Sequence, residues 1–190
     1  MNSASDEARL ETIIRSQPWL IEMLAAMRAL ALPDAVIAAG CIRNTVWDLL
    51  HHREPSMEFN DIDVMFFDPT GVLNESEIDR ELSRRVPGYD WQAKNQAFIH
   101  EWYRRKLGIE IAPLTSTEAG LEGFVETATA VGVRLEDDDS LTILAPLGLE
   151  DLFHLRLRVN ERSHDPEYFD QRVTSKGWLG RWPRLTVVAG

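Results

Sequence analysis

The sequence predicts an α/β (α+β) fold in which one small mixed β-sheet is flanked by helices. Two observations favour it. Segments with apolar residues at helical spacing intermix along the chain with short apolar or alternating segments typical of strands. Two alternating segments in the second half are separated by a polar turn, which indicates a β-hairpin. When helices and strands intermix in this way, the helices cover the faces of a shared sheet.

The first half of the chain is expected to form helices around two strands. Apolar residues recur at helical spacing over residues 7–30, with an interruption at Pro18, and again over residues 42–50. The continuous apolar run 35–40 ends in a glycine, as a buried strand often does. The segment 60–68 starts with period-two alternation and also predicts a strand.

The second half is expected to add a charged surface helix, a strand, a short helix, the hairpin and a closing helix. The spacing of Thr115 and Glu118 matches a capping box and should open the short helix. In chain order these segments are 75–86, 90–99, the helix opened by Thr115, the hairpin 126–135 with 141–147, and 149–160. The tail with Trp178 and Trp182 is expected to pack against the core.

The composition favours one globular domain over residues 1–190, because 190 residues with 44% hydrophobic content can bury a core. No apolar run of about 18 residues occurs, so we expect no membrane span. The polar, acidic first residues do not resemble a secretory signal. The single cysteine, Cys41, excludes an internal disulfide and agrees with a cytoplasmic location.

The formal net charge of -11 argues against non-specific binding of nucleic acid, which requires clustered Lys and Arg. The charge is uneven, because residues 1–150 carry -13 and residues 151–190 carry +2. The acidic part would attract metal ions or a cationic substrate, although simple solubility also explains it.

Asp61 and Asp63 surround a single isoleucine at the start of a predicted strand. Residues two apart on a strand project to the same face, so their carboxylates would lie roughly 6–7 Å apart and repel each other. Mg²⁺ prefers oxygen ligands and is often shared between one or two carboxylates and substrate phosphates. The pair therefore predicts a metal site, whereas the simpler alternative is a solvated strand edge.

Gly40 lies where a predicted strand passes into a predicted helix, and Arg43 follows in the first turn. A helix N-terminus offers free backbone N–H groups and partial positive charge, and a glycine lets phosphate oxygens approach closely. Arg43 adds a cation with planar donors. Each feature alone has a structural explanation, but together they form a cradle for a metal-bound triphosphate.

The motif GCIRN followed by DIDV resembles the signature of the polymerase-beta-type nucleotidyltransferase superfamily. Four further blocks look like a small, uncharacterised bacterial nucleotidyltransferase-like family, in which similar blocks follow in the same order. These blocks are WQAKNQAFIHEWY (91–103), TATAVGVRL (127–135), APLGLEDLF (145–153) and WPRL (182–185).

The resemblance implies a nucleotidyltransferase-like core whose site lies at the rim of the sheet. It implies transfer of a nucleoside monophosphate from an NTP to a hydroxyl, with Mg²⁺ or Mn²⁺ ligated by Asp61 and Asp63. It also implies that Gly40 and Cys41 bind the phosphates through backbone N–H groups and that Arg43 neutralises their charge. Asn44 and Lys94 are further candidates for nucleotide binding, and a strand lysine that reaches solvent is the alternative explanation of Lys94. The acceptor is expected to be a small molecule or a protein side chain, with nucleic acid ranked last and no membrane partner.

The sequence departs from this pattern at two positions. Cys41 stands where many relatives have glycine or serine, so only a backbone contact to phosphate is expected there. Active members usually supply a third carboxylate from the strand beside Asp-x-Asp, and the matching residue here is Gln92, with Asp90 as a possible substitute. A neutral amide is a poor base, so the alternative function is a non-catalytic module that binds Mg-NTP.

Several other polar and aromatic residues admit a site role but have simpler structural explanations. Thr127 and Thr129 would share one strand face and line the pocket, or would only suit an edge strand. His51 and His52 are expected at the surface. Trp178 and Trp182, with other tryptophans, are expected to pack the core or its rim and not to stack a base.

Overall fold

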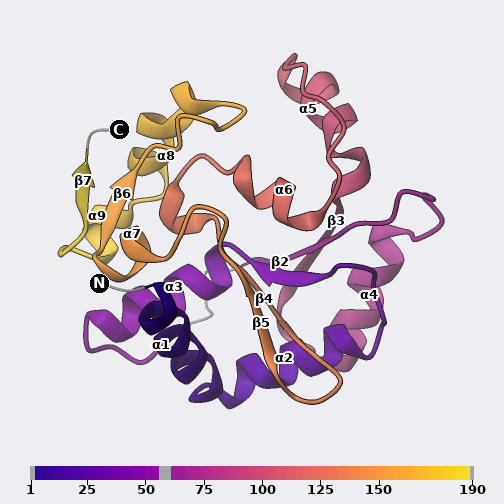
Figure 1. The fold of residues 1–190 in the computed structure, drawn as a ribbon, viewed down its shortest axis with the longest axis horizontal. Coiled ribbons are helices and arrows are strands. Elements are labelled where there is room, and N and C mark those ends of the chain that lie inside the picture. The colour runs from indigo at the N-terminus through magenta and orange to yellow at the C-terminus, as the bar shows by residue number, and fades with distance from the viewer. Residues whose placement is uncertain (1–2, 56–60, 189–190) are drawn as a thin grey trace.

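The computed structural model describes residues 3–55 and 61–188 (Figure 1). Within these ranges the central sheet has five strands in the order β3-β2-β1-β4-β5. Strands β2 and β3 pair in parallel and the other neighbours are antiparallel, so the sheet is mixed as predicted. The strands are β1 (Val36–Ala38), β2 (Asp61–Phe66), β3 (Asp90–Asn95), β4 (Gly132–Leu135) and β5 (Leu141–Leu144).

Four helices gather on one side of this sheet (Figure 1). They are α1 (Ser3–Arg15), α2 (Pro18–Arg28), α3 (Gly40–Leu50) and α4 (Glu75–Arg85), close to the predicted ranges. The main core forms between them and the sheet, with fully buried side chains such as Leu10, Leu24, Ile42 and Leu82. Burial of such side chains contributes about 1.5–3 kcal/mol each.

The two faces of β2 have different surroundings because its side chains alternate. Ile62, Val64 and Phe66 are fully buried in the main core. Met65 points the other way, into a smaller apolar cluster with Val36 and Leu121. Asp61 and Asp63 share that second face, so the fold places both aspartates on the side of the sheet away from α1 to α4.

The second face is bordered by α5 (Ile99–Leu107), α6 (Thr117–Glu122) and the C-terminal elements (Figure 1). The C-terminal part contains α7 (Glu150–Phe153), α8 (Phe169–Ser175), α9 (Trp178–Arg181) and a small parallel sheet of β6 (Arg156–Arg158) and β7 (Thr186–Val188). Short 3₁₀ turns occur at η1 (Gln96–Phe98), η2 (Thr127–Thr129) and η3 (Pro166–Tyr168). None of the helices in the described ranges is long and apolar enough to cross a membrane.

The predicted closing helix over 149–160 is wrong. Only the turn α7 is helical, the chain then reverses at Leu155 with φ +57°, and β6 follows. The alternation of Leu157 with Arg156 and Arg158 suits a strand, but its partner β7 lies about thirty residues further on. A pairing so distant in sequence leaves no local signal.

Three other segment predictions need adjustment. The expected strand 126–135 is a strand only from Gly132, because η2 precedes it. The expected strand 90–99 ends at Asn95, whose side chain caps the following turn by accepting a hydrogen bond from Ala97 N–H. Ser116, not Thr115, caps α6. Asn60, the first residue of the strand expected over 60–68, lies outside the described residues.

Candidate functional site

A cavity of about 280 Å³ opens where the start of β2 meets the start of α3 and the C-terminal helices. Five of the seven predicted site residues line it, namely Gly40, Arg43, Asn44, Asp61 and Asp63. The other lining residues are Ala39, Thr129, Arg172, Lys176, Trp178, Arg181 and Trp182. The fold therefore brings the glycine turn and the two aspartates to one cavity, although 20 residues lie between Gly40 and Asp61 along the chain.

Asp61 and Asp63 differ in their surroundings despite sharing one face of β2. Asp61 is exposed, whereas Asp63 is half-buried. Burial and the neighbouring charge of Asp61 raise the pKa of Asp63 to about 6, and the cations Arg43, Lys176 and Arg172 partly oppose this rise. The pair thus concentrates negative charge that a bound cation would stabilise.

The N-terminus of α3 presents its backbone N–H groups to the cavity. The first helical hydrogen bond runs from the Arg43 N–H to the Ala39 carbonyl at 2.9 Å, so the N–H groups of Gly40 and Cys41 have no acceptor within the helix. Ala39 adopts φ 56° and ψ -121°, a conformation that only glycine adopts without strain. The strained conformation of Ala39 places the start of α3 in the cavity that Asp61 and Asp63 also line.

Arg43 is a buried cation held by neutral groups. Its side chain is 5% exposed and donates to Asn44 Oδ1 at 2.8 Å and to Thr129 Oγ1 at 2.9 Å. The guanidinium also lies over the rings of Trp47 and Trp178, at 5.0 and 4.6 Å from the ring centroids. Burial lowers the pKa of Arg43 to about 10, so it remains charged at neutral pH.

No ion pair among the described residues involves Arg43, although a buried charge normally has a counter-ion. Glu126 contributes the strongest longer-range attraction, although it is ion-paired with Arg172, and Asp63 and Asp61 contribute less. The hydrogen bonds to Asn44 and Thr129 fix the plane of the guanidinium beside the cavity. A phosphate group would satisfy the missing counter-charge, because guanidinium and phosphate match as paired donors and acceptors.

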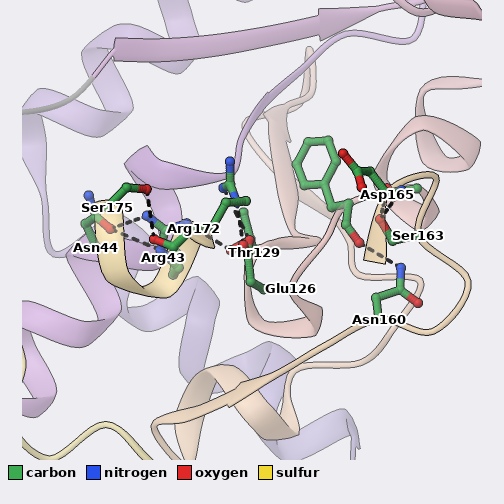
Figure 2. A network of polar contacts seen from close by, with 11 residues as sticks. Arg43, Asn44, Glu126, Thr129, Asn160, Ser163, Asp165, Arg172 and Ser175 are labelled. Carbon is green, nitrogen blue, oxygen red and sulfur yellow. Dashed lines mark hydrogen bonds and ion pairs between the residues drawn. The ribbon is translucent and has the colours of Figure 1, made fainter. Parts of the chain in front are cut away.

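The C-terminal helices supply three further cations that the sequence analysis did not predict. Arg172 from α8, Lys176 after it and Arg181 from α9 line the same cavity. Arg172 forms an ion pair with the fully buried Glu126, beside Arg43 (Figure 2). Arg181 contacts Asp48 at 3.2 Å. The only hint in the sequence was the +2 balance of residues 151–190 within an acidic chain.

Trp47, Trp178 and Trp182 hold this C-terminal region against α3. Trp47 packs edge-on against both of the others, with centroid distances of 6.0 and 5.1 Å. The Trp182 indole N–H donates to Asp48 at 2.7 Å. Trp178 and Trp182 are thus buried packing residues, as expected, and they also form part of the cavity wall.

The other two predicted nucleotide-binding residues lie elsewhere. The Cys41 side chain is fully buried in the core, where burial raises the pKa of its thiol, and Cys41 does not line the cavity. Lys94 lies on β3, outside this cavity, and forms an ion pair with Glu75 at 3.0 Å. The structure therefore separates Lys94 from the glycine turn.

Gln92 occupies the position expected for a third carboxylate. It is in register with Asp63 on the neighbouring parallel strand, and its amide N–H donates to Asp90 at 3.0 Å. Asp90 is in register with Asp61 and is exposed. Among the described residues no group of three His, Cys, Asp or Glu side chains is placed to hold a metal ion.

The donor set fits a divalent cation shared with a ligand better than one held by the protein alone. Asp61 and Asp63 provide hard oxygen donors with mutual repulsion that a cation would relieve. Two carboxylates leave most of an octahedral Mg²⁺ shell to water or phosphate oxygens. Asp61 and Asp63 are therefore the residues that would hold Mg²⁺ or Mn²⁺ once a triphosphate is present.

Of the threonines and histidines considered from the sequence, only Thr129 lines the cavity. It does so from the 3₁₀ turn η2 and not from a strand face, and it accepts the hydrogen bond from Arg43. Thr127 donates to Asp151 at 2.7 Å and lies away from the cavity. His51 and His52 lie at the end of α3, with His52 exposed.

Paired aspartates beside a helix N-terminus that carries Arg43 are the arrangement that the sequence motifs predicted for nucleotidyl transfer. The sequence profile of the nucleotidyltransferase family matches residues 25–187, so the chain belongs to that family. No curated protein sequence matches the chain.

Solved structures give the same fold. One is a protein whose NMR structure reveals a CCA-adding enzyme head domain, with a TM-score of 0.79 and 29% identity over 95% of this chain and 96% of that one. A CCA-adding enzyme in complex with CTP matches at TM-score 0.59 and 14% identity, over 94% of this chain and 43% of that one. A tRNA-processing enzyme complex matches at TM-score 0.53 and 20% identity, over 87% of this chain and 43% of that one.

The last two likenesses concern the fold alone, and the chain spans under half the length of those enzymes. The first likeness covers both chains almost completely. The polymerase-beta-type nucleotidyltransferase fold predicted from the GCIRN and DIDV motifs is confirmed by the family match and by this structure.

Proposed function

We propose that this chain, acting as a single cytoplasmic domain, transfers a nucleoside monophosphate from an NTP to a hydroxyl of a small-molecule or protein acceptor, with Mg²⁺ or Mn²⁺ as cofactor. The buried Arg43, which lacks a carboxylate partner among the described residues and faces the cavity of Asp61 and Asp63, carries the proposal. Membership of the nucleotidyltransferase family supports the reaction class.

The geometry assigns each group a part in binding. The N–H groups of Gly40 and Cys41 and the guanidinium of Arg43 would bind the β- and γ-phosphates, together with Arg172 and Lys176, which line the same cavity. Asn44 and Thr129 would keep Arg43 oriented. When bound, the metal would neutralise the leaving pyrophosphate and lower the pKa of the attacking hydroxyl.

In the transfer step the acceptor oxygen bonds to the α-phosphorus and the bond between that phosphorus and the bridging oxygen breaks. Pyrophosphate leaves with the electron pair, and the acceptor's proton passes to water. The cations around the cavity would stabilise the charge that develops on the leaving group.

Calorimetric titration with each NTP, with and without Mg²⁺, tests the binding half of this proposal. We expect Mg-dependent binding by wild type that Asp63→Ala abolishes. Binding that is unchanged in Asp63→Ala, or absent for all four NTPs with Mg²⁺ present, would contradict the site. A circular dichroism melt of the variant controls for unfolding.

A second candidate is a non-catalytic Mg-NTP-binding module, which Gln92 in the third carboxylate position favours. The two candidates differ in pyrophosphate release. A coupled pyrophosphate assay with wild type and the double variant Asp61→Asn, Asp63→Asn distinguishes them, because only an enzyme produces a signal that the double variant loses.

A nucleic-acid acceptor is a third candidate, supported by the similarity to structures described as tRNA-processing and CCA-adding enzymes. The net charge of -11 argues against it. Tight binding of RNA at moderate salt would favour this acceptor over a small molecule or a protein.

A further inference from the structure

A second cavity, of about 220 Å³, also borders Asp63 and shares no other lining residue with the cationic cavity. Asp63 lines both cavities, whereas Gln92 and Lys94 line only this one. The remaining lining residues are Met65, Gln96, Ile99, Trp102, Tyr103, Leu114, Gly120, Phe124 and His164. The carboxylate that would hold the metal therefore stands between a phosphate-binding cavity and an aromatic one.

The walls of this second cavity suit a flat ring. Trp102 and Tyr103 from α5 pack edge-on at 5.3 Å between centroids, and Tyr103 packs edge-on against His164 at 5.1 Å. Phe124, two residues after the end of α6, also lines the cavity. Aromatic side chains bind flat rings by offset or edge-to-face contact, while Gln92 and Lys94 offer hydrogen bonds to polar substituents.

Helix α5 has no fully buried side chain. Trp102 is 37% exposed and Leu107 is 48% exposed, whereas Ile99 and Tyr103 are partly buried. Elsewhere in the described chain most large apolar side chains are buried. Aromatic side chains that line a cavity without being buried are typical of a site completed by a ligand.

The direction of the transfer reaction decides which ligand this is. The attacking and leaving oxygens lie roughly in line through the phosphorus. In the proposed reaction pyrophosphate leaves into the cavity lined by Arg43, Arg172 and Lys176, so the attacking hydroxyl must reach the α-phosphorus from outside that cavity. The nucleoside is attached to a different oxygen of the α-phosphate and departs sideways from this line.

We infer that the cavity lined by Trp102, Tyr103 and Phe124 binds the acceptor, and that the acceptor is a small molecule whose hydroxyl is carried on or next to a flat ring. This inference rests on the proposed function. This cavity, at about 220 Å³, is smaller than the cationic cavity of about 280 Å³, which agrees with a compact acceptor.

The test uses two probes in parallel on the full chain. One is an NTP analogue with a methylene group between the α- and β-phosphates, titrated with Mg²⁺ by calorimetry. The other is a panel of phenyl glycosides, aryl alcohols and nucleosides, whose binding is detected by saturation-transfer NMR in the presence of the first probe.

The variants separate the two cavities. Trp102→Ala and Phe124→Ala alter the aromatic cavity, and Lys176→Ala alters the cationic one. Leu107→Ala is the matched control, because it lies on the same helix and does not line the cavity. Thermal melts confirm that each variant is folded, and Trp102→Phe provides a milder change if Trp102→Ala unfolds.

We expect at least one ring probe to bind wild type and the Leu107→Ala control, with at least a tenfold loss in Trp102→Ala or Phe124→Ala. The affinity for the NTP analogue should stay within threefold in those variants and fall at least tenfold in Lys176→Ala. A tenfold loss of NTP affinity in Trp102→Ala would place the nucleobase in this cavity and overturn the inference.

NTP binding without binding of any ring probe would overturn the acceptor cavity while leaving the proposed function intact. Absence of NTP binding in wild type would contradict the proposed function itself, and the inference with it. Binding of a short RNA that depends on Trp102, when no free ring probe binds, would replace the small molecule with a nucleic-acid end.

Discussion

At the scale of single residues, ionised Asp63 lowers the stability of the folded protein although it is a central residue of the site. Its pKa in the folded protein is raised from 3.8 to about 6 by burial and by Asp61. The folded protein therefore binds more protons than the unfolded chain between about pH 4 and pH 6, and its stability falls as the pH rises through this range. Above pH 6 the ionised Asp63 destabilises the fold.

Asp63→Asn should therefore stabilise the metal-free protein at pH 7.5. A shift of about two pKa units corresponds to about 3 kcal/mol, and partial exposure of Asp63 reduces this to about 1–2 kcal/mol. Urea unfolding at pH 7.5 and pH 4 measures the difference, which should nearly vanish at pH 4. Destabilisation by Asp63→Asn at pH 7.5 would contradict the raised pKa of Asp63. The control is Asp90→Asn, because Asp90 is exposed.

Gln92→Asp should give the protein a metal site that does not require nucleotide. Wild type offers two carboxylates, so we expect Mn²⁺ to bind only weakly without NTP, and a third carboxylate next to Asp63 should tighten binding about tenfold or more. Electron paramagnetic resonance of free Mn²⁺ measures this. Gln92→Asn keeps the amide and should behave as wild type, whereas equal affinity in all three proteins would exclude a metal ligand at this position.

At the scale of secondary-structure elements, the turn from β1 into α3 determines how the site is presented. Ala39 has φ 56°, whereas Gly40 has ordinary helical geometry. A methyl group built on Gly40 would make only ordinary contacts, at 3.8 Å from Arg43 Nη2 and 4.0 Å from Asn44 Nδ2. The conformational demand thus falls on Ala39, and any requirement for glycine at position 40 concerns a ligand.

Gly40→Ala should leave the free energy of unfolding within about 1 kcal/mol of wild type, because helix starts tolerate alanine. It should weaken Mg-NTP binding about tenfold, because the methyl group would stand between the helix N-terminus and the phosphates. Calorimetry and urea unfolding measure the two effects. Unchanged affinity would show that phosphates do not approach this turn closely.

Ala39→Gly should be neutral or stabilising by up to about 1 kcal/mol, since glycine adopts the positive φ without strain. Ala38→Gly, one residue earlier in β1 with a fully buried methyl group, should destabilise by about 1 kcal/mol. Urea unfolding of the pair measures both changes. Equal destabilisation by the two substitutions would argue against strain at Ala39.

At the scale of the whole molecule, the cavity combines the Gly40 turn and the aspartates with a C-terminal segment, residues 172–182, that lies more than 100 residues further along the chain. Trp182 fixes this segment to α3 through its hydrogen bond to Asp48 and its contact with Trp47. Arg172 is held by the buried Glu126. The position of the C-terminal cations in the cavity of Asp61 and Asp63 therefore depends on packing between the C-terminal segment and α3.

Trp182→Phe should destabilise the protein by about 1–3 kcal/mol, because buried Asp48 loses one of its hydrogen bonds. It should also weaken NTP binding by displacing Lys176 and Arg181. Trp19→Phe is the matched control, because the Trp19 indole N–H donates to Gln17 at 3.2 Å in a partly exposed position. Its cost in the free energy of unfolding should be under about 0.5 kcal/mol. Equal costs would contradict a special role for Trp182.

The sequence alone determined the mixed sheet, the helices of the first half and the pairing of Asp61 with Asp63. Each of these depends on local periodicity, because alternation on β2 alone fixes which side chains share a face. The glycine turn before α3 was predictable for the same reason, since strand and helix patterns meet at Gly40.

Only the tertiary structure decided what surrounds the aspartates. Arg172 and Lys176 approach from the C-terminal helices, Lys94 is directed elsewhere by Glu75, and the aromatic cavity combines α5 with Phe124 and His164. The pairing of β6 with β7 was missed because its partners are about thirty residues apart. These features depend on contacts between segments distant in the chain, and such contacts leave no period in the sequence.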